Sequence, residues 1–288
     1  MIHSLEEEHI EMTEYPEFRM STEEAFCRLF RIHVNQTEAA KGTEGGKFDR
    51  ILQAEVLGYK VVQHALSALA LFRGVQIPEL APHSHYRDAF SILGLARMCH
   101  ESFLLFNHLF VTPATREEAE FRFLAWSYVD SAKQARFPVS SDEGKELLKS
   151  VLEFVKEFRS ELEENSLFKE LSDSKRNKIL VELRWPLLTW NELGKEAGFN
   201  ELHALHVYRY LCSYAHPGSL SVRQLRLALG TPMQPHFMEM GLKHCAIMLA
   251  CLASDYSKPF PKSFAIPSDG GDDSRLVKLY EHFARGNC

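Results

Sequence analysis

The sequence lacks the patterns that identify the commonest nucleotide-binding folds and disulfide-stabilised domains. Neither GxGxxG nor GxxxxGK[ST] occurs, which argues against the classical dinucleotide-binding and P-loop folds. The 288 residues contain 6 cysteines without a CxxC pair, so we expect free, reduced thiols and no disulfide framework. No stretch alternates polar and apolar residues for long enough to predict a strand. The remaining candidates for regular structure are helices.

An excess of positive charge and a long apolar run are also missing. There are 33 Lys+Arg against 39 Asp+Glu, giving a net charge of -6, so no global positive field attracts nucleic acid or acidic membranes, although a local basic patch is compatible with this balance. The longest apolar run, residues 245–253, covers about half of the ~20 residues that a membrane helix needs. The N-terminus is acidic where a secretory signal is basic. We therefore expect a cytoplasmic protein without membrane association.

Helical periodicity runs along most of the chain. Ser21 and Glu24 form a capping box at the start of one helix, and apolar residues three and four apart predict further helices. The strongest of these core helices span residues 48–72, 86–111, 114–137, 199–216 and 235–256. Their apolar stripes cannot be buried separately, so we predict an all-α, irregular helical bundle of about seven to ten helices.

The same patterns suggest three parts of the chain. The pattern predicts an N-terminal helical extension over residues 1–47 and a helical core domain over residues 48–256. Within that core domain, residues 143–165 predict a peripheral helix, because one face is apolar and the opposite face carries Lys and Glu. Residues 257–288 read as a linker and a C-terminal helix.

The segment around His216 carries the clearest chemical signal. Arg209 and His216 are seven residues apart, so they share one face of a helix, about 10 Å apart along its axis, and could contact one phosphate group. Pro217 places His216 at the helix C-terminus, where the helix dipole favours imidazolium. A histidine that titrates near neutral pH can act as a general acid or base. The alternative is a surface arginine and a structural helix end.

An Arg and a His at this spacing on one helix resemble the motif of HEPN-type helical domains. Many members of that family are metal-independent ribonucleases of toxin and antiviral systems. More closely, the motif Tyr208-x-x-Leu-Cys-x-x-x-His216-Pro217 resembles a family of uncharacterised, mainly bacterial all-helical proteins. The resemblance covers about residues 48–256 and implies a HEPN-like core. Active HEPN nucleases usually have Asn, Asp or His after the Arg, and this chain has Tyr210 there.

A second candidate group, Arg97 and Glu101, lies inside an otherwise apolar helix. The two residues are four apart and face the same way, and burial of either alone would be costly. They are either a structural ion pair or part of the site, with Arg97 facing the same cleft as His216. Tyr208 and Tyr210 would line that cleft, whereas His100 points elsewhere and reads as a core histidine.

Three further clusters are better explained by packing than by chemistry. His203 and His206 share a helix face and could join His83 and His85 in a zinc site, but no spacing requires one, so we expect neither a metal nor a cofactor. Cys212 lacks the sequence context of a nucleophile. The aromatic residues of the 114–137 helix could stack on bases, yet core packing explains them. These are Phe121, Phe123, Trp126 and Tyr128.

Two functions from different classes follow. The first is a metal-independent endoribonuclease of a defence or toxin-like system, with Arg209 and His216 acting on RNA phosphate. The alternative is a non-catalytic HEPN-like module that binds a nucleotide, RNA or protein partner through the same residues. In either case we expect a homodimer, because HEPN-like sites often form between two copies and two of the predicted helices are unusually apolar.

Overall fold

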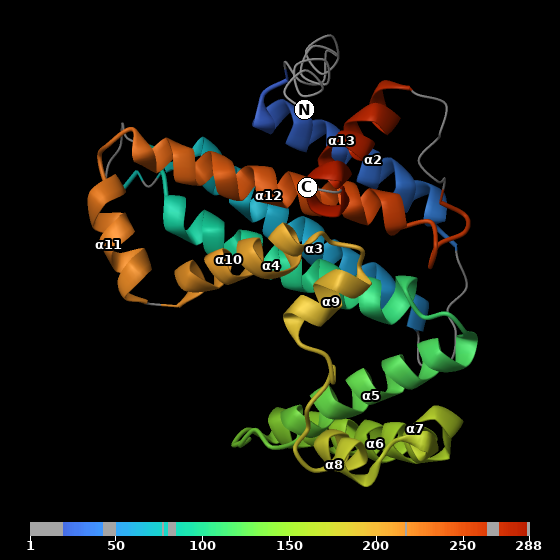
Figure 1. Ribbon diagram of the computed structural model, residues 1–288. Coiled ribbons are helices and arrows are strands. Elements are labelled where there is room, and N and C mark those ends of the chain that lie inside the picture. Colours follow the sequence, from blue (N-terminus) through green and yellow to red (C-terminus); the bar gives the residue numbers. More distant parts are fainter. Residues whose placement is uncertain are drawn as a thin grey trace.

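The computed structural model describes residues 20–42, 50–76, 78–79, 85–216, 218–263 and 271–286. It confirms the all-α class: these residues contain twelve α-helices, slightly more than the seven to ten expected, because several short segments form helices of their own (Figure 1). The α-helices are α2 (Thr22–Ala40), α3 (Arg50–Arg73), α4 (Ala89–Phe106), α5 (Arg116–Gln134), α6 (Asp142–Glu164), α7 (Ser166–Glu170), α8 (Asp173–Leu180), α9 (Trp190–Glu196), α10 (Tyr208–Ala215), α11 (Ser219–Ala228), α12 (Met233–Asp255) and α13 (Asp272–Arg285).

Two π-helical segments and one small ribbon complete the described elements. The π-segment η3 (Asn107–Val111) continues α4, and η4 (Leu202–Val207) leads into α10. The strands β1 (Val75–Gln76) and β2 (His85–Tyr86) pair antiparallel beyond the end of α3. The sequence predicts one continuous helix over 86–111 and another over 199–216, whereas each contains a π-turn, which rotates the residues on either side relative to one another.

Helices α3, α4 and α12 form the centre of the main bundle (Figure 1). Helix α4 packs against α3, α12 and α10, and α12 also contacts α2 and α13. The approach of α12 to α4 is close at Gly241, where a Cβ atom would lie 2.5 Å from Ile92 Cγ2. Any larger side chain at position 241 would therefore push the two central helices apart.

The N-terminal and C-terminal helices belong to this same bundle. Helix α2 begins at the capping box expected from the sequence, with Ser21 and Glu24 each satisfying a backbone amide of the other residue. Its buried residues, among them Phe26 and Leu29, join the same hydrophobic core as those of α12 and α13. The apolar faces of α2 and α13 are thus covered by α12, and the ends of the described chain stabilise the centre.

Helices α5 to α8 surround a second, smaller hydrophobic cluster (Figure 1). Phe121, Tyr128 and Leu162 are buried there, with the Tyr128 hydroxyl donating to the carbonyl of Leu180 at 3.1 Å. Helix α6 buries only Val151 and Leu162, so most of it faces solvent, in keeping with its charged sequence. Phe123 of α5 belongs to the main core and ties the two clusters together.

Two helical stretches of the described residues are long and apolar enough to cross a membrane, judged by length and composition alone. They are Ala89–Val111 and Met233–Asp255, each of 23 residues. The second stretch contains the nine-residue apolar run at 245–253. The structure buries 56% of the apolar window in the first stretch and 78% in the second, a pattern also found in the core helices of soluble proteins.

Candidate functional site

His216 lies directly after the last residue of α10, as its proline neighbour predicts. It is the C-cap residue, with extended backbone angles of φ -119° and ψ 149°, and its side chain is exposed. Pro217 itself lies outside the described residues. The imidazole is therefore presented to solvent at a fixed point of the fold.

Arg97, from the middle of α4, reaches this imidazole. The Arg97 Nη1 atom lies 3.2 Å from His216 Nε2, although the two residues are 119 positions apart in the sequence. A guanidinium has only donors, so Nε2 of His216 serves as the acceptor in this contact. The pair joins an exposed acid–base group to a permanent cation.

Glu101 and Tyr208 fix the position of Arg97. Glu101 Oε1 accepts from Arg97 Nε at 2.9 Å and lies 2.8 Å from Nη2, and the Tyr208 hydroxyl donates to the same oxygen at 2.9 Å. Burial would lower the pKa of Arg97, but Glu101, with Cys212 and Tyr208, outweighs it and raises that pKa. Arg97 therefore stays charged, and Nη1 is its one nitrogen directed at His216.

The two interpretations of Arg97 and Glu101, a structural ion pair and a part of the site at His216, are compatible. Both side chains are about one-fifth exposed, at 19% and 22%, and they form the ion pair that the spacing predicts. The same arginine also contacts His216, as the functional reading requires. The Tyr208 ring lies 5.9 Å from that of Trp190 and 5.6 Å from that of His100. This aromatic packing fixes the position of the Tyr208 side chain.

The structure does not bring every expected residue to this cluster of Arg97, Glu101, Tyr208 and His216. The Arg209 side chain is exposed and forms no hydrogen bond or ion pair with any described residue. Tyr210 bonds to the hydroxyl of Tyr214 at 2.8 Å, and Tyr214 in turn bonds to Gln224 of α11. Burial raises the pKa of Tyr210. The residue that departs from the HEPN pattern thus serves the packing of α10 on α11.

Cys212 is a member of the cluster that the sequence analysis did not select. Its thiol interacts with both Tyr208 and Arg97. Burial, together with Cys212 and Glu101, strongly raises the pKa of Tyr208, which keeps this hydroxyl protonated as a donor. The spacing of four residues from Tyr208 to Cys212 places both on one face of α10, and that spacing was the available signal.

The histidines that could have formed a zinc site, although none was expected, do not share one helix face. His203 is buried and its ring stacks on His244 at 6.0 Å, whereas His206 is exposed. His244 Nε2 lies 3.0 Å from Nδ1 of His100, so three imidazoles form a buried column. The described residues contain no group of three His, Cys, Asp or Glu side chains arranged to hold a metal. His83 and the side chain of His85 lie outside the described part.

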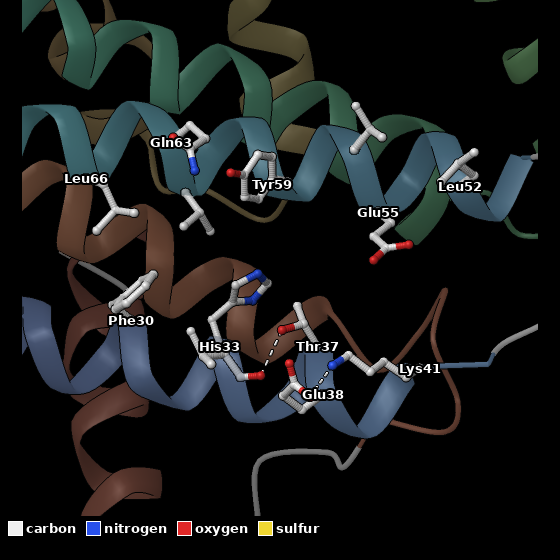
Figure 2. A pocket seen from close by; sticks show the side chains of 13 residues that line it. Phe30, His33, Thr37, Glu38, Lys41, Leu52, Glu55, Tyr59, Gln63 and Leu66 are labelled. Carbon is white, nitrogen blue, oxygen red and sulfur yellow. Dashed lines mark hydrogen bonds and ion pairs between the residues drawn. The ribbon is translucent and has the colours of Figure 1, made fainter.

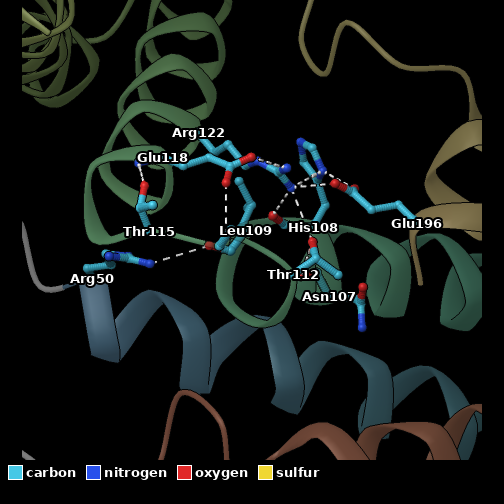
Figure 3. Close-up of polar contacts among 10 residues, drawn as sticks. Arg50, Asn107, His108, Leu109, Thr112, Thr115, Glu118, Arg122 and Glu196 are labelled. Atoms are coloured by element: carbon cyan, nitrogen blue, oxygen red, sulfur yellow. Dashed lines mark hydrogen bonds and ion pairs between the residues drawn. The ribbon is translucent and has the colours of Figure 1, made fainter. Parts of the chain in front are cut away.

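A second polar constellation joins the main bundle to the peripheral helices (Figure 3). Arg122 of α5 lies 2.7 Å from Glu196 Oε1 and donates to the carbonyl of His108 at 2.9 Å. The other Glu196 oxygen lies 2.5 Å from Nδ1 of His108, a residue of η3. Burial would raise the pKa of Glu196, but His108 and Arg122 outweigh it and lower that pKa. Arg122 and His108 Nδ1 contact carboxylate or carbonyl oxygens, whereas His108 Nε2 is buried without a partner among the described atoms. The ion pairs between α5, η3 and Glu196 indicate a mainly structural role for this group.

A mainly apolar cavity lies between α2 and α3, away from the cluster at His216 (Figure 2). It encloses about 530 Å³, and Figure 2 shows the His33 ring directed from α2 towards α3. Burial lowers the pKa of His33 to about 4, and its Nδ1 has no partner among the described atoms. The polar side chains at its edge include Glu38 and Lys41, which pair with each other.

Comparison with family models, with curated proteins and with solved structures gives no match for this chain. The functional assignment therefore depends on the residues and their geometry.

Proposed function

We propose that this protein is a metal-independent endoribonuclease of a defence or toxin-like system, acting through His216 and Arg97 with Arg209 as a further contact to RNA. The observation that carries the proposal is the 3.2 Å approach of Arg97 Nη1 to His216 Nε2 at an exposed helix end. An acid–base group beside a permanent cation is the minimum that cleavage of an RNA phosphodiester by its own 2′-hydroxyl requires.

The hydrogen bond between the two residues suggests how substrate would engage them. In the free protein, His216 Nε2 accepts from Arg97. A phosphate oxygen is a stronger acceptor than a neutral imidazole, so bound RNA would take over Nη1 and release Nε2. The freed Nε2 would then accept the proton of the ribose 2′-hydroxyl.

The proposed step is an attack of the 2′-oxygen on the adjacent phosphorus. The bond from phosphorus to the 5′-oxygen breaks, and this leaving oxygen takes a proton from water or from protonated His216. The products are a 2′,3′-cyclic phosphate and a free 5′-hydroxyl. Arg97 would stabilise the additional negative charge on the phosphorane, because Glu101 and Tyr208 hold the guanidinium in place before the charge develops.

The role of Arg209 follows from its exposure. The sequence pattern pairs it with His216, but its side chain forms no hydrogen bond or ion pair with another described residue. An exposed arginine one residue after Tyr208 suits a contact with the RNA backbone, which depends on salt. We therefore assign the reacting phosphate to Arg97 and a flanking phosphate to Arg209.

The test is RNA cleavage in EDTA by the purified protein and by His216→Ala, Arg97→Ala and Arg209→Ala. We expect the first two to reduce the cleavage rate by about 100-fold or more, as loss of a general acid–base group or of a charge-stabilising donor does. Arg209→Ala should cause a smaller loss, of about tenfold at low salt, that diminishes as the salt concentration is raised, because the variant makes one phosphate contact fewer. His206→Ala is the matched control, because His206 is exposed and lies on the preceding π-turn.

Three outcomes would contradict the assignment. Cleavage that EDTA abolishes would exclude a metal-independent reaction, and unimpaired cleavage by both His216→Ala and Arg97→Ala would exclude their roles. A loss of activity that accompanies a loss of helicity by circular dichroism would identify the cluster as structural.

A non-catalytic binding module is the second candidate, and the ion pair to Glu101 favours it. Glu101 engages two of the three Arg97 nitrogens and offsets its charge, which weakens stabilisation of a phosphorane. In that case no RNA would be cut, and fluorescence anisotropy would show RNA binding that Arg97→Ala weakens and His216→Ala leaves nearly unchanged.

We also propose that the protein is a homodimer, and the surface of α11 supports this. Four of its large apolar side chains are between 42% and 57% exposed: Leu220, Val222, Leu227 and, directly after the helix, Leu229. Light scattering should give twice the 33.0 kDa of one chain, and Leu227→Asp should shift the mass towards one chain. Leu52→Asp on α3 is the control, because Leu52 is 49% exposed on a different surface. A mass of one chain at micromolar concentration would refute the dimer.

A further inference from the structure

Helix α5 presents a row of aromatic and polar residues that lines a cavity separate from the site at His216. Phe123, Trp126, Ser127 and Asp130 follow one another at spacings of three, one and three, so they lie on one helix face. Phe121 and Tyr128, the other two aromatic residues noted in this helix, turn instead into the peripheral cluster. Phe123 and Trp126 pack against the main core and at the same time line a cavity beside α5.

That cavity encloses about 430 Å³ between α5, α6 and Gln53 of α3. Its second wall is formed by Phe154 and Phe158, four residues apart on α6, with ring centroids 6.1 Å apart. On the α5 side, the rings of Phe123 and Trp126 also lie 6.1 Å apart. Four aromatic rings thus line one open space, of a size in the range of roughly 300–1,000 Å³ that is usual for small-molecule sites.

Asp130 gives this aromatic cavity a negative charge. Its carboxylate interacts with the Trp126 side chain one turn away. The nearest cation is Lys133, whose Nζ lies 3.8 Å from Oδ1, and both side chains of that pair are at least half exposed. An ion pair of this length and exposure is weak, so the carboxylate can take another cation as its partner.

We propose that the cavity lined by Trp126, Phe123, Phe154, Phe158 and Asp130 binds an organic cation with methyl substituents, such as a quaternary ammonium group. The faces of aromatic rings carry negative charge density that attracts a cation, while the methyl groups fill apolar space. Asp130 supplies charge complementarity and repels phosphates and carboxylates. The site is separate from the cluster at His216 and does not depend on the function proposed for it.

The discriminating experiment compares choline with its uncharged isostere 3,3-dimethylbutan-1-ol by titration calorimetry on the full-length protein. The two molecules have nearly the same shape, so a merely apolar cavity would bind both alike. We expect choline to bind at least about tenfold more tightly, because cation–π attraction and the carboxylate act only on the charged ligand.

Two variants test the assignment of residues, each with a matched control. Asp130→Asn should weaken choline binding by about fivefold and leave binding of the neutral isostere unchanged, whereas Asp142→Asn should alter neither. Asp142 suits this comparison because it is exposed and pairs with Lys145 three residues on, as Asp130 pairs with Lys133. Phe154→Leu removes a half-exposed ring from the wall, and Phe137→Leu removes an exposed ring elsewhere.

The results separate the alternatives clearly. Tighter binding of choline that both site variants weaken, and that both controls preserve, supports the proposal. Equal affinity for choline and the neutral isostere would overturn it, as would binding that Asp130→Asn and Phe154→Leu leave intact or no binding at all. Phe154 and Asp130 are exposed enough that their replacement should leave the fold unchanged, which circular dichroism would verify.

Discussion

Lowering the pH from 7 to 5 is expected to reduce the free energy of unfolding by several kcal/mol. Burial lowers the pKa of His33 and His203 to about 4 and that of His100 to about 3, and it lowers the pKa of His244 well below the ordinary value. Below the unfolded pKa near 6.5, the unfolded chain binds protons that the folded chain does not. Stability is therefore greatest above that pH and falls as the pH falls towards the folded values.

The size of this effect follows from the number of histidines involved. One histidine with a folded pKa near 4 costs about 2 kcal/mol of stability between pH 7 and pH 5. The four groups together are therefore expected to lower the free energy of unfolding by several kcal/mol, a large share of the whole stability of a typical domain. Three of the four touch one another, so a proton on His244 also disfavours protons on His100 and His203.

Urea denaturation at pH 7, 6 and 5 measures the effect directly. The His33→Leu variant should show a weaker pH dependence of stability. In the wild type, His33 binds a proton in the unfolded chain but not in the folded chain, and the variant loses this difference of about one proton. His206→Leu serves as the control, since His206 is exposed. Stability that is constant between pH 7 and pH 5 would show that these histidines are not buried in neutral form.

Replacing Asp255 with Ala is expected to destabilise the fold by about 3–5 kcal/mol, as loss of one partner from a buried ion pair does. Asp255 is 5% exposed at the end of α12. One of its oxygens, Oδ2, accepts from Asn107 at 2.8 Å and from Arg285 at 2.5 Å. Without it, Asn107 and Arg285 on two other elements would lose a buried partner, and the Ser254–Glu281 hydrogen bond would remain as a polar contact between α12 and α13.

Chemical denaturation of matched variants separates this network from ordinary surface pairs. Asp173→Ala removes a carboxylate that is 96% exposed and pairs with Arg176, so we expect a change below about 1 kcal/mol. The double variant Asp255→Leu with Arg285→Met removes both charges and should be less destabilised than Asp255→Ala alone. If Asp255→Ala and Asp173→Ala cost the same, the carboxylate at 255 is not buried.

Helix caps, one helix end and one ion pair of this protein could be predicted from the sequence. The capping box at Ser21 and Glu24 depends on residues three apart, and the structure confirms it. The end of α10 at His216 follows from the restriction that Pro217 imposes on the residue before it. The ion pair between Arg97 and Glu101 follows from one turn of helix. In each case the interacting groups are close in sequence, so their geometry is set by the backbone alone.

The sequence could indicate only some members of the site at His216. It marked Arg97, Glu101, Tyr208 and His216, but it placed the cation nearest the imidazole at Arg209. The structure puts Arg97 there instead, because α4 packs against α10 and delivers a residue from 119 positions away. Which arginine meets His216 depends on how two helices pack, and periodicity within one helix carries no such information.

The sequence by itself determined the helical class, the caps and the polar residues that need partners, because these depend on neighbours within one or two turns. Tertiary packing decided which partners they find. The π-turn at Leu202–Val207 turns His203 into the core and leaves His206 in solvent, although the two are spaced to share a face of a regular helix. The cavity beside Trp126 likewise needs aromatic rings from α5 and α6 together. Side chains on separate helices come together only when burial of the apolar faces sets the position of each helix.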